Sequence, residues 1–125
     1  MIEPIRILLV DDHTPFRAGL AALLSTSEEF VIVGEVEEGA RVVSAIEQLQ
    51  PDVVLMDLNM PGMSGIDATR ATASSAPHIG VLVLTMFDDD DSVFAALQAG
   101  ARGYLLKGAS KTEIQQSVRA VAAGQ

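Results

Sequence analysis

The chain has 125 residues, of which 49% are hydrophobic and 20% charged, and this is the size and composition of one globular domain with no room for a second. It has no cysteine, which excludes disulfides and thiolate metal sites, and no signal-peptide pattern or apolar run of about 18 residues, so we expect a cytoplasmic protein without membrane contact. Seventeen acidic against eight basic residues give a net charge of −9, the wrong sign for binding the phosphate backbone of nucleic acid.

The first half of the chain predicts two strand–helix pairs. Residues 5–10 and 31–36 are short, apolar runs typical of strands that are buried on both faces. Between them, Thr14 before Pro15 indicates the N-cap and first turn of a helix. Apolar residues recur at helical spacing after each strand: Phe16, Leu20, Leu23 and Leu24 after the first, and Val42, Ile46 and Leu49 after the second.

The second half predicts three more pairs. Strands are expected at 53–56, 79–85 and 103–107. The third helix should follow Ser64, the fourth should follow the acidic run Asp88 to Asp91, and the fifth should begin with the capping box of Ser110 and Glu113. Two glycines are typical of helix C-termini: Gly100 and Gly124.

Strict alternation of strand and helix predicts parallel strands joined by right-handed crossovers. The expected fold is therefore α/β and doubly wound, a single (βα)5 domain spanning residues 1–125, and we expect the flavodoxin-like variant because it makes neighbours of the four strands that end in polar residues. Its five-stranded parallel sheet has the order 2-1-3-4-5, with helices on both faces. In such sheets ligands bind beyond the carboxyl ends of the strands, where the strand order reverses.

Polar side chains stand at the carboxyl ends of four of these strands: Asp11 and Asp12, Asp57, Thr85, and Lys107. Three neighbouring carboxylates raise one another's pKa unless a cation compensates them, and Mg²⁺ favours such oxygen ligands. Together with an ammonium and a hydroxyl, they form a cradle for a phosphoryl group in transfer, with Asp57 as the nucleophile.

These motifs resemble the receiver domain of two-component response regulators. The shared features are DD at 11–12, DLNMPGMSG from Asp57, LT at 84–85 and YLLKG at 104–108, and the resemblance extends from residue 5 to about 124. The segments DDH, KGAS and IQQSVRAVAAG are most similar to the NarL/FixJ subfamily. Its members usually carry a LuxR-type helix-turn-helix domain after the receiver, and such a module is expected in the full-length protein unless this is a stand-alone receiver.

The resemblance implies a phosphoacceptor and a metal site. Asp57 would accept a phosphoryl group from a histidine kinase. Asp12 would bind Mg²⁺ directly, Asp11 through water, and Asn59 through its backbone carbonyl, with Asp57 completing the set.

The resemblance also implies a switch. Thr85 and Lys107 would hold phosphoryl oxygens, and Tyr104 would turn inward when Thr85 moves. Two positions depart from the family: Gly108 stands where many receivers have a proline after a cis peptide, and Met86 is bulkier than the usual small residue and would narrow access to the acyl phosphate.

The domain would then not be an enzyme, because the only reactions it catalyses would be phosphotransfer to its own aspartate and its own dephosphorylation. We expect it to form a homodimer on activation. The surface of its fourth helix, fifth strand and fifth helix is the expected output surface, for a second receiver or for the DNA-binding domain. It would contact DNA only through the separate C-terminal domain.

Three other functions fit parts of the pattern. A phosphatase of the haloacid dehalogenase type needs a second acid two residues after the nucleophile, where this chain has Asn59. A flavodoxin-like FMN site would be repelled by the two aspartates after the first strand. A receiver-like interaction module that is never phosphorylated remains the alternative, and the bulky Met86 favours it.

Overall fold

The computed structural model describes residues 3–60, 62–86 and 90–124. Its strands are β1 (Ile5–Val10), β2 (Phe30–Val36), β3 (Val53–Asp57), β4 (Gly80–Thr85) and β5 (Gly103–Leu106). Its helices are α1 (Thr14–Leu24), α2 (Val42–Leu49), α3 (Gly65–Ser75), α4 (Asp90–Ala99) and α5 (Lys111–Ala122), and a short 3-10 turn, η1 (Gly39–Arg41), precedes α2. None of the helices within these described ranges is long and apolar enough to cross a bilayer.

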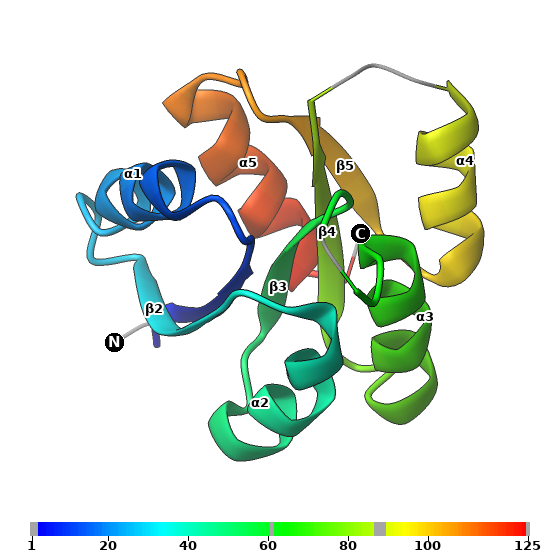
Figure 1. The fold of residues 1–125 in the computed structure, drawn as a ribbon. Helices are drawn as coiled ribbons and strands as arrows, with labels where there is room; N and C mark the ends of the chain where they lie inside the picture. The colour runs from blue at the N-terminus through cyan, green and yellow to red at the C-terminus, as the bar shows by residue number, and fades with distance from the viewer. Residues whose placement is uncertain (1–2, 61, 87–89, 125) are drawn as a thin grey trace.

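The five strands form one parallel sheet in the order β2-β1-β3-β4-β5, which confirms the predicted flavodoxin-like topology. Helices α1 and α5 cover one face of the sheet, and α2, α3 and α4 cover the other (Figure 1). The order reverses between β1 and β3, because β2 lies on the outer side of β1. A crevice at the carboxyl ends of β1 and β3 is therefore the expected place for a ligand.

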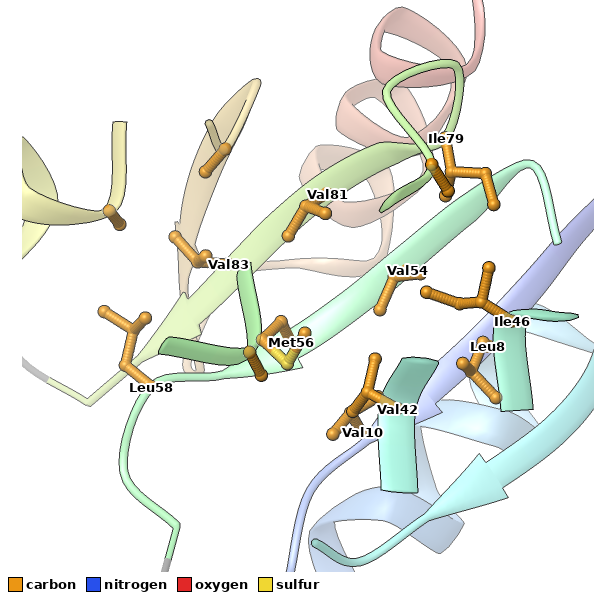
Figure 2. Close-up of a cluster of buried hydrophobic side chains, with 14 of the residues drawn as sticks. Leu8, Val10, Val42, Ile46, Val54, Met56, Leu58, Ile79, Val81 and Val83 are labelled. Carbon is orange, nitrogen blue, oxygen red and sulfur yellow. The ribbon is translucent and has the colours of Figure 1, made fainter. Parts of the chain in front are cut away.

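Side chains of the central strands alternate between two hydrophobic cores. Leu8, Val54 and Val81 point to the core under α2, α3 and α4 (Figure 2). Ile7, Val53 and Leu82 point to the core under α1 and α5. Every residue of β3 and β4 is buried, as the apolar runs predicted, whereas the edge strands β2 and β5 are partly exposed.

The helix ends agree with most of the sequence signals. The capping box of Ser110 and Glu113 is present at α5, Ser64 caps α3 by accepting a hydrogen bond from the Asp67 amide at 3.2 Å, and Gly100 and Gly124 have positive φ. Helix α4 begins within the acidic run, at Asp90, while Asp88 and Asp89 lie outside the described residues.

The predicted N-cap of α1 is wrong. Thr14 is already helical, and His13 occupies the N-cap position without a side-chain hydrogen bond. The carboxylate of Asp11 instead accepts a hydrogen bond from the His13 amide at 2.8 Å. Aspartate commonly bonds the backbone two residues ahead in this way, so the turn before the helix is held by Asp11.

Candidate phosphoacceptor and metal site

Three carboxylates meet where β1 and β3 end. Val10 pairs with Met56 in the sheet, so Asp11 and Asp57, the next residues of the two chains, stand side by side. Oxygen atoms of Asp11, Asp12 and Asp57 all lie within 4.8 Å of one another. Asp11 and Asp57 are each only 1% exposed, whereas Asp12 is exposed. The fold therefore brings together the three acids that the sequence predicted to be neighbours.

Lys107 supplies the positive charge of the cluster. Its Nζ lies 3.0 Å from Asp11 Oδ2 and 3.4 Å from Asp57 Oδ1, and its side chain is 11% exposed. The lysine is held at both ends: its backbone amide donates to the Thr85 carbonyl at 2.9 Å, and its Nζ lies 4.8 Å from the centroid of the Phe16 ring. Thr85, at the end of β4, is itself buried. The two predicted phosphoryl-binding residues are thus adjacent and tied together through the backbone.

The two oxygens of Asp11 have different partners. Oδ1 accepts the hydrogen bond from the His13 amide, and Oδ2 faces the Lys107 ammonium. Oδ2 is buried and accepts no well-aligned hydrogen bond from the described residues, so the ion pair is what offsets its loss of water. Asp11 therefore has a structural role beside the one predicted for it at the metal site, because it holds the turn for which Thr14 was expected to supply the cap.

The environment of Asp57 raises the pKa of its carboxyl group. Burial is the main cause, because the charged form loses water, and the negative charge of Asp11 adds to it. The Asn59 amide, which donates to Asp57 Oδ1 at 3.1 Å, and the Lys107 ammonium both lower the pKa but do not cancel the effect of burial. Additional positive charge at this place would favour the ionised form that can act as a nucleophile.

The donor set suits a hard divalent cation. All the clustered ligand atoms are carboxylate oxygens, and three ionised carboxylates with one ammonium leave a net charge of −2. The buried Asp11 Oδ2 is a ready acceptor for a cation or its water. Asn59 follows within hydrogen-bond reach of Asp57, and the role of its carbonyl as a further ligand stays a prediction.

The remaining predicted residues lie around the β4 and β5 ends. Tyr104 is 43% exposed and Met86 61% exposed, and both line a hollow of about 560 Å³ with Leu106 and Gly108. Met86 therefore points into solvent beside Tyr104. The peptide between Lys107 and Gly108 is trans, as are all those of the described residues.

The sequence interpretation missed two residues of the site. Gly65, at the start of α3, lies against the end of β3 so closely that a Cβ would collide with the Asp57 carbonyl oxygen and Leu58 Cα. Arg17 is 8% exposed, and its Nη1 donates to the Asp11 carbonyl at 2.5 Å. A signal for Arg17 was present, since it shares the buried face of α1 with Leu20 and Leu24 at helical spacing.

Comparison with protein families gives a match over most of the chain. Residues 7–119 match the response regulator receiver domain. The transcriptional regulatory protein LiaR of Bacillus subtilis is 43% identical over 121 residues, which are 97% of this chain and 57% of LiaR. The response regulator GacA of Pseudomonas aeruginosa is 42% identical over 121 residues, covering 97% of this chain and 56% of GacA. The chain thus spans little more than half the length of these relatives.

Solved structures agree with the fold. The signal receiver domain of the putative response regulator NarL from Mycobacterium tuberculosis has a TM-score of 0.94 and 39% identity, with 99% of this chain and 100% of that chain covered. A two-component response regulator of the LuxR family from Aurantimonas has a TM-score of 0.92 and 33% identity, covering 98% of this chain and 87% of that one.

Proposed function

This chain belongs to the response regulator receiver domains of the NarL/LuxR type, and from that premise we propose that it is a phosphorylation-dependent switch. Asp57 would accept one phosphoryl group from the phosphohistidine of a histidine kinase: a phosphorus–oxygen bond forms and the phosphorus–nitrogen bond breaks. The domain would turn over nothing else apart from its own dephosphorylation, so it is a signalling module and not an enzyme in the ordinary sense.

The observation that carries this proposal is the position of the Asp57 carboxylate. It is buried at the end of β3, its Oδ1 lies 3.4 Å from the Lys107 ammonium, and one of its oxygens lies within 4.8 Å of oxygens from the two other acids. Phosphoryl transfer depends mainly on positioning and on neutralising the charge of the transferred group. The cluster offers both requirements at a single nucleophilic oxygen.

The site residues divide into two groups. Asp11, Asp12 and Asp57, with the Asn59 carbonyl, would hold Mg²⁺, which supplies charge neutralisation for the incoming phosphoryl group. Lys107, now shared between Asp11 and Asp57, would move its ammonium to a phosphoryl oxygen. Thr85 would donate its hydroxyl to another such oxygen.

The exposed apolar face of α4 and β5 is our candidate for the output surface. Phe94 is 62% exposed and Leu97 43% on α4, and Met86, Tyr104 and Leu106 at the ends of β4 and β5 are exposed as well. Tyr104 would turn inward when Thr85 is drawn to the phosphoryl group, which changes this face. A homodimer of the activated receiver would form there.

Transcription is the proposed output. LiaR is a transcriptional regulatory protein, and the match covers 57% of its length. The net charge of −9 makes this domain a poor ligand for DNA, so a LuxR-type helix-turn-helix domain elsewhere in the full-length protein would make that contact in the cytoplasm.

Labelling with acetyl phosphate and Mg²⁺, read by intact mass and peptide mapping, tests the phosphoacceptor. We expect one phosphoryl group on Asp57, none on Asp57→Asn, and normal labelling of Asp67→Asn, which alters an exposed acid on α3. Equal labelling of Asp57→Asn would refute the assignment. A parent chain that binds Mg²⁺ but is never labelled, with acetyl phosphate or with kinases, would favour the unphosphorylated interaction module.

A further inference from the structure

Helix α1 buries an arginine beside the acidic cluster. Arg17 is 8% exposed and lies on the inner face of α1 with Leu20 and Leu24. Burying a guanidinium is unfavourable unless its donors are paired, so the position needs specific acceptors. The phosphoryl-transfer roles proposed above do not use this residue.

Three acceptors surround the guanidinium. Nη1 donates to the Asp11 carbonyl at 2.5 Å, Nε donates to Glu35 Oε1 at 2.8 Å, and Nη2 donates to Glu37 Oε1 at 3.0 Å. Burial lowers the pKa of Arg17, but the bonds to Glu35 and Glu37 more than offset this effect and raise it overall. Arg17 therefore links the turn that carries the acids to the carboxyl end of β2.

The acceptor in that turn is the carbonyl that joins Asp11 to Asp12. Because the peptide unit is planar, fixing its oxygen also fixes the direction in which the chain enters Asp12. The Asp11 amide is held by the Val36 carbonyl at 3.0 Å, so the backbone of Asp11 is bonded on both sides. A guanidinium presents its donors in a rigid fork, which suits it to hold these three groups in one geometry.

We infer that Arg17 is a positioning residue for the divalent cation site: it sets cation affinity by fixing the Asp11–Asp12 peptide. This inference rests on the proposed function for the existence of that site. Groups behind the direct ligands change metal affinity about 10- to 100-fold when they are removed.

Charge and positioning make opposite predictions here. Arg17 is a cation close to a site for a cation, so removing its charge alone would tighten Mg²⁺ binding. Loss of the hydrogen bond that anchors the Asp11–Asp12 peptide would weaken Mg²⁺ binding, because the ion itself would then have to order the carboxylates. The direction of the change in Kd therefore separates the two effects.

The experiment is a Mg²⁺ titration of the parent, Arg17→Met and Arg17→Lys, followed by calorimetry and by the amide signals of residues 11–13 and 57–59. We expect Kd to rise about 10- to 100-fold in Arg17→Met. Arg17→Lys keeps the charge, but its single ammonium cannot reach all three acceptors, so its Kd for Mg²⁺ should also rise. The lysine variant replaces Arg17→Met in this test if the methionine variant does not fold.

Arg102→Met is the matched control. Arg102 also bonds two carbonyls, those of Val121 at 3.2 Å and Pro77 at 3.1 Å, but it precedes β5 at the opposite end of the sheet. We expect it to lower the melting temperature without changing the Kd for Mg²⁺. At saturating Mg²⁺ the Arg17 variants should be labelled by acetyl phosphate as fully as the parent.

The outcomes separate this inference from the proposed function. An unchanged or lower Kd in a folded Arg17 variant would overturn the positioning role while leaving the site intact. Weakening by Arg102→Met to the same extent would also overturn it, because the effect would then be one of general stability. A parent chain that does not respond to Mg²⁺ would contradict the proposed function itself.

Discussion

The carboxylate of Asp57 lies in surroundings that favour its protonated form. The residue is 1% exposed, and its pKa is raised first by burial and then by Asp11, against the opposing effects of the Asn59 amide and Lys107. A nucleophilic carboxylate has to be ionised, so the folded chain keeps its reactive group in a state that costs stability. This cost is what a bound cation would relieve.

We predict that this cost appears as a pH dependence of folding in the absence of metal. The folded state holds the Asp57 proton more tightly than the unfolded state, so the contribution of Asp57 to the free energy of unfolding falls as the pH rises from about 4 through its raised pKa. Asp57→Asn should therefore be more stable than the parent at neutral pH, by about 1.4 kcal/mol for each unit of difference in pKa.

Urea unfolding in EDTA at several pH values measures this effect. The advantage of Asp57→Asn should shrink towards pH 4 and also on adding Mg²⁺ to the parent. Glu47→Gln removes one charge from an exposed position on α2 and controls for the general repulsion of a chain with net charge −9. An equal pH-dependent gain in Glu47→Gln would show that net charge, not Asp57, is responsible.

Among the elements, the ends of β4 and β5 are joined by backbone hydrogen bonding. Thr85 pairs with Leu106 in the sheet, and its carbonyl accepts the hydrogen bond from the Lys107 amide at 2.9 Å. Tyr104 lies on β5 two residues before Leu106, 43% exposed. A displacement of Thr85 would therefore act on β5, which carries Tyr104, and on Lys107, which follows that strand.

We predict that Thr85→Ala accepts phosphate at Asp57 but switches weakly. A hydrogen bond to a charged group contributes about 1.5 to 3 kcal/mol, and moving an equilibrium from 1:99 to 99:1 takes about 5.5 kcal/mol. Bonds from Thr85 and Lys107 together just reach that value, so losing one leaves the change incomplete. Amide shifts on phosphorylation should be smaller over residues 90–108 than in the parent.

Thr85→Ser keeps the hydroxyl and is the control for the loss of volume at this buried position. It should retain most of the shifts of the parent. Full-sized shifts in phosphorylated Thr85→Ala would refute coupling through this side chain, even with Asp57 correct as the phosphoacceptor.

At the scale of the whole molecule, the acidic cluster joins parts of the chain that are distant in sequence. It unites the carboxyl ends of β1 and β3 and draws in Lys107 from the end of β5. Repulsion among Asp11, Asp12 and Asp57 therefore destabilises the folded state relative to the unfolded state, in which Asp57 is no longer held beside the other two acids. A ligand that neutralises the cluster should stabilise the domain as a unit.

We predict that Mg²⁺ raises the melting temperature and that Asp12→Ala abolishes the gain. An ion that binds only the native state at about 100 times its Kd adds roughly 2.7 kcal/mol to the free energy of unfolding. Thermal unfolding with MgCl2, compared with NaCl of equal ionic strength, isolates specific binding from screening.

Asp67→Ala is the matched control, since it removes an exposed acid of α3 that is ion-paired to Arg70 at 3.1 Å. Its stability can fall, but its gain from Mg²⁺ should equal that of the parent. A parent melting temperature that does not respond to Mg²⁺ would count against the cation site.

The fold and the chemical character of the site can be predicted from the order and type of the residues. Alternating strand and helix patterns predicted a parallel, doubly wound sheet. The polar residues at the strand ends, Asp11, Asp57, Thr85 and Lys107, favoured the order 2-1-3-4-5, and the structure brings them to neighbouring strand ends. These predictions succeed because the periodicity of apolar residues is a local property that identifies each strand and helix. The rules for parallel crossover connections then predict which strand ends lie next to each other in space.

The atoms through which these residues interact could not be predicted and are known from the folded chain. Asp11 divides its two oxygens between the His13 amide and Lys107, Arg17 bonds the Asp11 carbonyl, and Gly65 gives room to the carbonyl of Asp57. The false N-cap at Thr14 has the same origin, because a cap depends on the path of the chain into the helix as well as on residue type. A pattern of residue types places a side chain on a face or at a strand end, but its hydrogen-bond partners are chosen by the packing of segments that are distant in the sequence.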